Sequence, residues 1–251
     1  GLERYPLSLK EIKKIEPNIN LKNIYGGFFT KSDMTGDIHL FTKQLAHICK
    51  KNGVTFNFDS CVHNINHLNG KIKIFYKKND QIEEENFSGL VICAGVHSKQ
   101  LANLVGDRVN IYPVKGYSIT VILNDTESQI SAPSVSLLDD EAKIVSSRLG
   151  KKRFRIAGTA EFNGYNKDIR YDRIFPLIKW CNNLFPKVST EHCIPWAGLR
   201  PMTPSMMPKV GKGKLPGIFY NTGHGHLGWT LCALTSQIIS DEIVRNNNLL
   251  T

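Results

Sequence analysis

The chain has 251 residues, 41% of them hydrophobic and 22% charged, which is the composition of a globular protein large enough to bury a sizeable core. No run of about eighteen apolar residues occurs and the N-terminus has no signal-peptide pattern, so the sequence predicts a cytoplasmic protein without a membrane-spanning helix. The net charge of +10 comes with no nucleic-acid-binding motif. We therefore expect no nucleic-acid partner, while peripheral contact with an anionic membrane surface stays open.

The cysteines are scattered without C-x-x-C spacing and mostly lie within apolar patterns, which predicts reduced, buried thiols; they are Cys49, Cys61, Cys93, Cys181, Cys193 and Cys232. The pair His224 and His226, with His192 and Cys193 upstream, raises the possibility of zinc. Alternate residues in a glycine-rich turn make a poor tetrahedral ligand set, however. We therefore predict no metal site.

The chain opens with a short predicted helix from Ser8 to Ile15. Ser8 is a typical N-cap, and Glu11 at the third helical position completes a capping box. Pro17 ends this helix. A strand is then expected over 25–29.

A second helix is predicted from Ile38 to Lys51, preceded by a capping turn over 33–37 and ended by Asn52-Gly53. A strand is expected directly after it, from Val54 to Phe58. The predicted buried stripe of the helix consists of Leu40, Phe41, Leu45 and Ile48.

Three alternating stretches follow, separated by Asn-Gly and Asn-Asp turns, and together they predict an antiparallel meander over 62–65, 72–76 and 82–87. The continuous apolar run from Leu90 to Ala94 then predicts a strand buried on both faces. It ends at Gly95, where a loop reaching Ser98 could meet a phosphate or a ribose.

Between 109 and 190 the pattern changes to half-buried strands over 117–123, 135–138, 142–147 and 154–158, with a helix over 171–184. This predicts a second, antiparallel layer inserted between pieces of the first.

The most informative stretch is the step from a predicted strand, 217–221, through the glycine-dense turn 222–228 into an apolar-periodic helix. Glycines let a ligand approach the backbone, and the helix start favours negative charge. The turn therefore predicts a cradle for an anion or a cofactor, although a glycine-rich connection without a ligand is the alternative. Gly223-x-Gly225-x-x-Gly228 matches the dinucleotide-binding fingerprint, but no second parallel strand with an acidic residue follows, so we reject a Rossmann unit here.

Two further residues are candidates for substrate binding. Arg200 lies among prolines in a segment that we expect to be a rigid loop rather than a helix or central strand, and a fixed arginine suits bidentate binding of a carboxylate or phosphate. A structural salt bridge is the alternative for this residue. Tyr117 either offers its hydroxyl to a substrate or packs in the core.

Several motifs in register resemble the bacterial FAD-dependent D-amino acid dehydrogenases, within the D-amino acid oxidase and glycine oxidase superfamily. They are Tyr112-Pro-Val-Lys-Gly-Tyr-Ser, Trp196-Ala-Gly-Leu-Arg-Pro-Met-Thr-Pro and Asn221-Thr-Gly-His-Gly-His-Leu-Gly-Trp-Thr, with Val91-Ile-Cys-Ala-Gly-Val-His-Ser and Gly158-Thr-Ala-Glu in the family's order. The resemblance extends from about Leu9 to Ile243.

This resemblance implies a mixed α/β fold in which an incomplete FAD-binding domain, 33–108 and 199–251, is interleaved with an antiparallel-sheet substrate-binding domain, 1–32 and 109–198. It also implies that FAD oxidises a D-amino acid, that the product becomes a 2-oxo acid and ammonia, and that electrons pass to a quinone-linked acceptor. By the same resemblance Arg200 and Tyr117 would bind the substrate carboxylate. The implied cofactor ligands are Val62, Ala94, Gly95, Gly223, His224, Gly225, His226, Leu227 and Gly228.

The family's N-terminal strand and its Gly-x-Gly-x-x-Gly turn have no counterpart in this sequence. We therefore expect an exposed sheet edge and apolar face, and with them self-association or a second chain that completes the fold. The competing hypothesis is a catalytically inactive remnant or interaction subunit of such a flavoenzyme.

Overall fold

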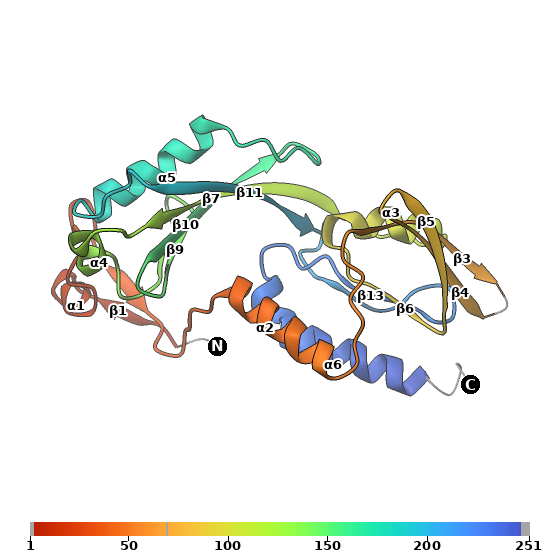
Figure 1. The fold of residues 1–251 in the computed structure, drawn as a ribbon. Coiled ribbons are helices and arrows are strands. Elements are labelled where there is room, and N and C mark those ends of the chain that lie inside the picture. The colour runs from red at the N-terminus through yellow and green to blue at the C-terminus, as the bar shows by residue number, and fades with distance from the viewer. Residues whose placement is uncertain (1–2, 69, 247–251) are drawn as a thin grey trace. The chain divides into compact units, whose positions relative to one another are not determined.

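The computed structural model describes residues 3–68 and 70–246 (Figure 1). The chain forms two compact units, one made of 1–43, 115–161 and 166–198 and the other of 44–114, 162–165 and 199–251. Each unit is discontinuous in sequence and combines helices with sheets. The predicted class, a mixed α/β fold containing antiparallel sheets, is confirmed.

A five-stranded sheet with the order β11-β7-β10-β9-β8 gives the first unit its core. Its strands are β7 (Tyr112–Ile122), β8 (Leu137–Asp139), β9 (Ile144–Leu149), β10 (Arg153–Phe162) and β11 (Cys193–Met202). The helix α5 (Tyr171–Leu184) lies along the sheet (Figure 1), and its Leu177 and Trp180 join Tyr117 and Ile156 in one buried cluster. The short helix α4 spans Thr126–Ser131. The helix over 171–184 and the alternation of β10 were therefore predicted correctly, whereas β7 is buried on both faces rather than half-buried.

The N-terminal segment of the same unit holds β1 (Tyr5–Leu7), α1 (Leu9–Ile15) and β2 (Gly27–Phe29), with β1 antiparallel to β2. The predicted capping box is confirmed. The backbone N–H of Glu11 donates to Ser8 Oγ over 3.4 Å, and the N–H of Ser8 donates to Glu11 Oε2 over 2.8 Å. These two bonds satisfy donors that the first helical turn leaves without a backbone acceptor.

The second unit contains two three-stranded sheets. One is the predicted meander, formed by β3 (Ser60–Leu68), β4 (Lys71–Lys78) and β5 (Gln81–Phe87) with antiparallel pairing throughout. The other has the order β12-β13-β6, from β12 (Lys209–Lys212), β13 (Ile218–Thr222) and β6 (Leu90–Ile92), and in it β13 runs parallel to β6. The 3-10 helix η1 (Gly95–His97) and the helix α3 (Ser98–Leu104) follow β6, while α6 (Gly228–Asn246) contacts β12 and β13.

Helix α2 (Ile38–Lys51) has the predicted bounds and its predicted cap, because Asp37 Oδ1 accepts from the N–H of Leu40 over 3.1 Å. Its predicted buried stripe is wrong, since α2 has no buried residue and those four side chains are 45–55% exposed: Leu40, Phe41, Leu45 and Ile48. A local pattern fixes which face of a helix is apolar, but it does not supply the layer that covers that face. The predicted strand from Val54 to Phe58 is also wrong, because this segment is irregular and Phe58 is 71% exposed.

Strand β6 is shorter and less buried than predicted. It ends at Ile92, which is its only buried residue, while Leu90 and Val91 are partly exposed. The reason is its position, because β6 is an edge strand that pairs with β13 alone in the described sheet.

The cysteines are free, as predicted, but only Cys181 is fully buried, and burial raises the pKa of its thiol to about 12. None of the helices described combines the length and hydropathy needed to cross a membrane.

Candidate functional site

The turn between β13 and α6 requires glycine for two separate reasons. Gly223 and Gly225 have φ values of 78° and 58°, in the left-handed region that other residues adopt at a cost. A Cβ atom would also lie 2.8 Å from Thr203 Cγ2 at the first position and 2.8 Å from Met202 Sδ at the second. The N–H of Gly225 donates to the carbonyl of Pro201 over 3.0 Å, which fixes the turn against that segment. The backbone is therefore held in one conformation that only glycine permits.

A second glycine turn lies at the same edge of the sheet. Because β6 and β13 are parallel, with Ile92 opposite Tyr220, the turns that follow them both leave from the carboxyl ends of the strands. Inside this edge Ser98 Oγ and Thr222 Oγ1 are buried and 2.7 Å apart, and Thr222 Oγ1 also donates to the carbonyl of Gly95 over 3.4 Å. The carboxyl edge of parallel strands is where open α/β sheets bind ligands. The structure thus brings Ala94 and Gly95 together with Gly223 in one place.

The remaining residues of the turn divide into an inner and an outer set. His224 is half-buried, and its Nε2 lies 3.1 Å from Thr235 Oγ1 on the next turns of α6. Burial lowers the pKa of His224, so its ring is neutral at physiological pH. His226 and Leu227 are exposed just before α6 begins at Gly228. The turn therefore presents exposed residues and the positive end of a long helix, which together favour a negatively charged ligand.

Val62 lies in the same unit, on β3 opposite Tyr76 and beside a register shift between Val62 and Asn64. Its side chain is partly buried and packs against the core cluster that also contains Ile92 and Tyr220. The strand that carries Val62 is therefore anchored to the same core as the two glycine turns.

The two candidate substrate ligands have different surroundings. Arg200 lies on β11 rather than in the predicted loop, and β11 is an edge strand, a position where proline is tolerated in a sheet. Partial burial lowers the pKa of Arg200 without discharging it. Tyr117 is only 1% exposed, and its hydroxyl donates to Glu161 Oε2 over 2.6 Å. The tyrosine hydroxyl is thus already bonded within its own unit. Arg200 is partly exposed to solvent.

Sequence reasoning missed a buried charge network around Tyr117. Lys115 is fully buried, and its Nζ donates to Asn166 Oδ1 over 3.2 Å and to the carbonyl of Asp168 over 3.1 Å. The same Nζ lies 3.7 Å from Glu161 Oε2. The hydrogen bond from Tyr117, followed by the positive charge of Lys115, lowers the pKa of Glu161. The signal was the spacing of Lys115 and Tyr117, because residues two apart on a strand share one face.

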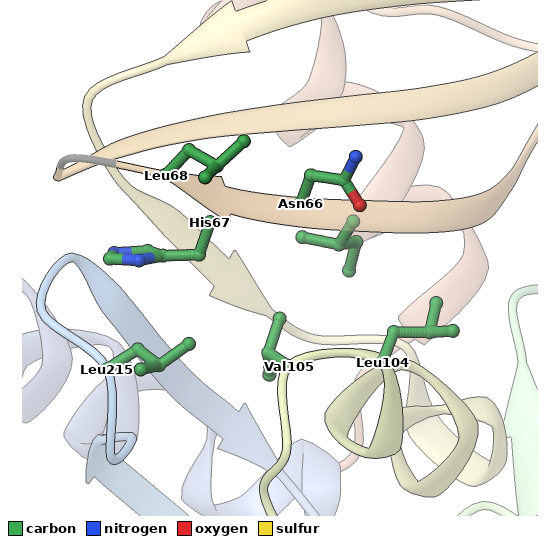
Figure 2. A pocket seen from close by; sticks show the side chains of 7 residues that line it. Asn66, His67, Leu68, Leu104, Val105 and Leu215 are labelled. Carbon is green, nitrogen blue, oxygen red and sulfur yellow. The ribbon is translucent and has the colours of Figure 1, made fainter.

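The second unit also has a small surface cavity of about 370 Å³ (Figure 2). Figure 2 shows side chains from β3, the end of α3 and the segment before β13 around it: Ile65, Asn66, His67, Leu68, Leu104, Val105 and Leu215. His67 Nε2 lies 3.0 Å from the carbonyl of Pro216. None of the predicted site residues lines this cavity. Elsewhere in the described ranges, no three His, Cys, Asp or Glu side chains gather as metal ligands would.

Comparison with known proteins decides the family. A family model described as FAD dependent oxidoreductase matches residues 1–242. The chain belongs to this FAD-dependent family. D-amino acid dehydrogenase 3 of Mesorhizobium japonicum is 53% identical over 243 residues, which cover 97% of this chain and 58% of that protein. A D-amino acid dehydrogenase of Dechloromonas aromatica is 37% identical, with the same two coverages.

Solved structures of the family share the fold. Glycine oxidase from Geobacillus kaustophilus superposes with a TM-score of 0.85 at 19% identity, over 98% of this chain and 64% of that one. L-proline dehydrogenase from P. horikoshii gives a TM-score of 0.81 at 15% identity, over 98% and 65%. The chain thus spans about three fifths of the length of the curated relatives it matches.

Proposed function

We propose that the protein takes part in the FAD-dependent oxidation of a D-amino acid to an imino acid, which water converts to a 2-oxo acid and ammonia. The observation that carries this proposal is the pair of glycine turns at one sheet edge, of which the turn between β13 and α6 needs glycine at Gly223 and Gly225 for both conformation and space. The names of the relatives, which are D-amino acid dehydrogenases, support the substrate class.

In this proposal FAD, when bound, supplies the acceptor for the hydride of the substrate. The turn from Gly223 to Gly228 holds its pyrimidine end, because the start of α6 stabilises the negative charge that reduction develops there. Ala94 and Gly95 hold the ribose and pyrophosphate, and Val62 lies by the adenine. The residues fit such a group, since Gly95 has a left-handed φ of 54° and an added Cβ there would have nothing within 4 Å, which leaves its backbone open to close approach.

Arg200 is the proposed ligand of the substrate carboxylate. Its guanidinium stays charged and can donate two parallel hydrogen bonds to a carboxylate. Partial burial strengthens such a pair relative to one in water. Tyr117, whose hydroxyl is held by Glu161, is proposed to support this site rather than to bind the substrate directly. In this assignment 33–108 and 199–251 form the cofactor-binding domain, and 1–32 and 109–198 form the substrate-binding domain.

A quinone-linked carrier is the proposed acceptor of the electrons. The net charge of +10 supports the accompanying proposal that the protein contacts an anionic membrane surface peripherally. Co-sedimentation with anionic and with neutral vesicles tests the membrane proposal. Binding to anionic vesicles that falls with added salt is the expected result, and equal recovery with both vesicle types would contradict it.

The decisive experiment is a visible absorption spectrum of the purified chain before and after addition of FAD, followed by D-alanine. We expect flavin bands that shift on binding and bleach with D-alanine but not with L-alanine. Arg200→Met should keep the shifted bands and lose the bleaching, which separates cofactor binding from substrate binding. A chain that binds no FAD, alone or with an added partner, would reject the proposal.

A second candidate function is that of an interaction subunit without activity of its own. It is favoured by the apolar side chains that α6 exposes, since Leu234 is 60% and Val244 65% exposed. Such a protein would form a stable complex and would stay colourless in the FAD experiment.

A further inference from the structure

We infer that Arg155, held by Trp196, forms a carboxylate-binding site in the first unit. The guanidinium carbon of Arg155 lies 5.4 Å from the centroid of the indole ring. No hydrogen bond or ion pair of this guanidinium is found among the residues that the structure describes. Arg155 therefore presents a fixed cation whose hydrogen-bond donors remain available.

The indole also packs against its own strand. An added Cβ on Gly198 would lie 2.0 Å from the Cη2 atom of Trp196 and 2.6 Å from Cζ3, so the ring packs directly over Gly198 on the same strand. Gly198, the indole and the guanidinium are thus neighbours that come from β11 and β10. The ring attracts the cation, while the guanidinium N–H groups form a rigid planar fork. Such a fork suits bidentate carboxylate binding.

The charges around Arg155 also favour an anion. Asp37 is the acidic group that acts on Arg155, but Asp37 Oδ2 is already held by Arg153 Nη2 at 2.6 Å. Asp37 Oδ1 in turn accepts from the backbone of Leu40. Two guanidinium groups on one strand face therefore share one carboxylate, which leaves one positive charge uncompensated. Desolvation lowers the pKa of Arg155, in keeping with a cation that burial has deprived of water.

The neighbouring strand adds hydroxyl groups to this face. Ser147 lies directly opposite Arg155 in the antiparallel pair β9–β10, so both side chains are on one face of the sheet. Ser147 Oγ lies 3.2 Å from Ser136 Oγ, which also bonds Thr35 Oγ1. A carboxylate on Arg155 would therefore meet a guanidinium fork, an aromatic wall and hydroxyl donors.

Calorimetric titration with two isomeric probes tests the inference and identifies the source of the carboxylate. D-glutamine carries only the α-carboxylate and D-isoglutamine only the side-chain carboxylate. We expect at least one of them to bind the full-length chain, and Arg155→Met to weaken that binding by about tenfold or more, as loss of a charged hydrogen bond does. Arg155→Lys should restore part of the affinity. Lys151→Met, which removes one charge from the turn before the same strand, is the control and should not change it.

Three results of these titrations would contradict a carboxylate site at Arg155. Binding of neither isomer, binding that Arg155→Met leaves intact, or an equal response to inorganic phosphate would overturn the inference. Gly198→Ala provides a second test, because displacing Trp196 should shift its fluorescence and weaken probe binding together, while circular dichroism confirms the fold. The inference rests on the proposed function only for the choice of D-amino acid probes. A chain that binds them at Arg155 yet takes up no FAD would reject the proposed function and keep this inference.

Discussion

At the scale of single residues, Gly225 gives the sharpest test of the proposed cofactor-binding role of the turn between β13 and α6. Gly225→Ala combines a left-handed φ of 58° with a Cβ placed 2.8 Å from Met202 Sδ. We expect a loss of about 1–3 kcal/mol in the free energy of unfolding and at least a tenfold loss of FAD affinity, measured by chemical denaturation and by flavin titration.

Gly164→Ala is the matched control for this prediction. Its φ of 53° is nearly the same, but an added Cβ would have nothing within 4 Å. Gly164→Ala should lower the free energy of unfolding by the conformational cost alone, without a steric contribution, and it should not change the FAD affinity. Equal effects of both substitutions on FAD affinity would contradict the proposed role of the turn.

His224 makes stability depend on pH in a known direction. Burial lowers the pKa of His224 below its ordinary value of 6.5, so near that pH the unfolded chain binds the proton more readily than the folded one. Stability is therefore complete above the unfolded pKa and is lost as the pH falls through 6.5 toward the folded pKa. His224→Gln should flatten this part of the profile in melting experiments between pH 7.5 and 5. His226→Gln removes an exposed ring from the same turn, and a similar flattening there would contradict the assignment to His224.

Sequence predicted the residues of the glycine turns better than those of the Arg155 stack, for a physical reason. Positive φ and helix starts are local properties, so the few residues around Gly223 and Gly225 are enough to predict a turn that needs glycine. The contact between Arg155 and Trp196 joins two strands that are far apart in sequence. Only the strand pairing of the folded sheet brings them together. Folding likewise brings together Ser98 and Thr222, whose hydrogen bond links the two glycine turns.

At the scale of elements, the ends of β7 and β10 depend on the buried network of Lys115. Glu161→Gln removes the negative charge 3.7 Å from a fully buried ammonium group and weakens the bond to the Tyr117 hydroxyl. A buried cation that loses its counter-charge is strongly unfavourable. We expect a fall of several degrees in the melting temperature. The fall should shrink toward acid pH, because the pKa of Glu161 is lowered and its contribution is lost as the pH falls through that value.

The exposed pair of Glu127 and Lys187 is the comparison for that prediction. Its atoms are 4.0 Å apart and both side chains are about 70% exposed. Glu127→Gln should leave the melting temperature unchanged, as expected for a pair screened by water. If the two substitutions had equal effects, the stability would not depend on burial of Lys115.

The elements themselves were predicted where local chemistry determines them. The capping box of Ser8 and Glu11 and the bounds of α2 and α5 follow from caps, glycines and periodicity. Burial was predicted poorly, because it depends on what other layers cover. The apolar stripe of α2 is exposed, and β6 lies at a sheet edge instead of in a sheet interior.

At the scale of the whole molecule, α6 carries an apolar face that its own unit does not bury. The helix contacts β12 and β13 and buries Thr235 and Ile239, whereas Leu234 and Ile238 are 60% and 44% exposed. Positions four apart lie on one helix face, so these two form a continuous stripe with Leu227 and Leu231. Such a stripe favours association with a second copy of the chain, in which both partners bury it.

Sedimentation velocity over a range of concentrations should therefore show reversible self-association. The double substitution Leu234→Gln and Ile238→Gln should weaken it by at least tenfold, because burying each side chain contributes about 1.5–3 kcal/mol. Leu68→Gln with Ile82→Gln, which removes side chains that are 69% and 68% exposed on the meander, is the control and should leave it unchanged. If both double substitutions weakened self-association equally, non-specific hydrophobic contacts would explain the association. If the chain stayed monomeric at every concentration, the apolar face of α6 would need a different partner, such as the complementary chain of an interaction subunit.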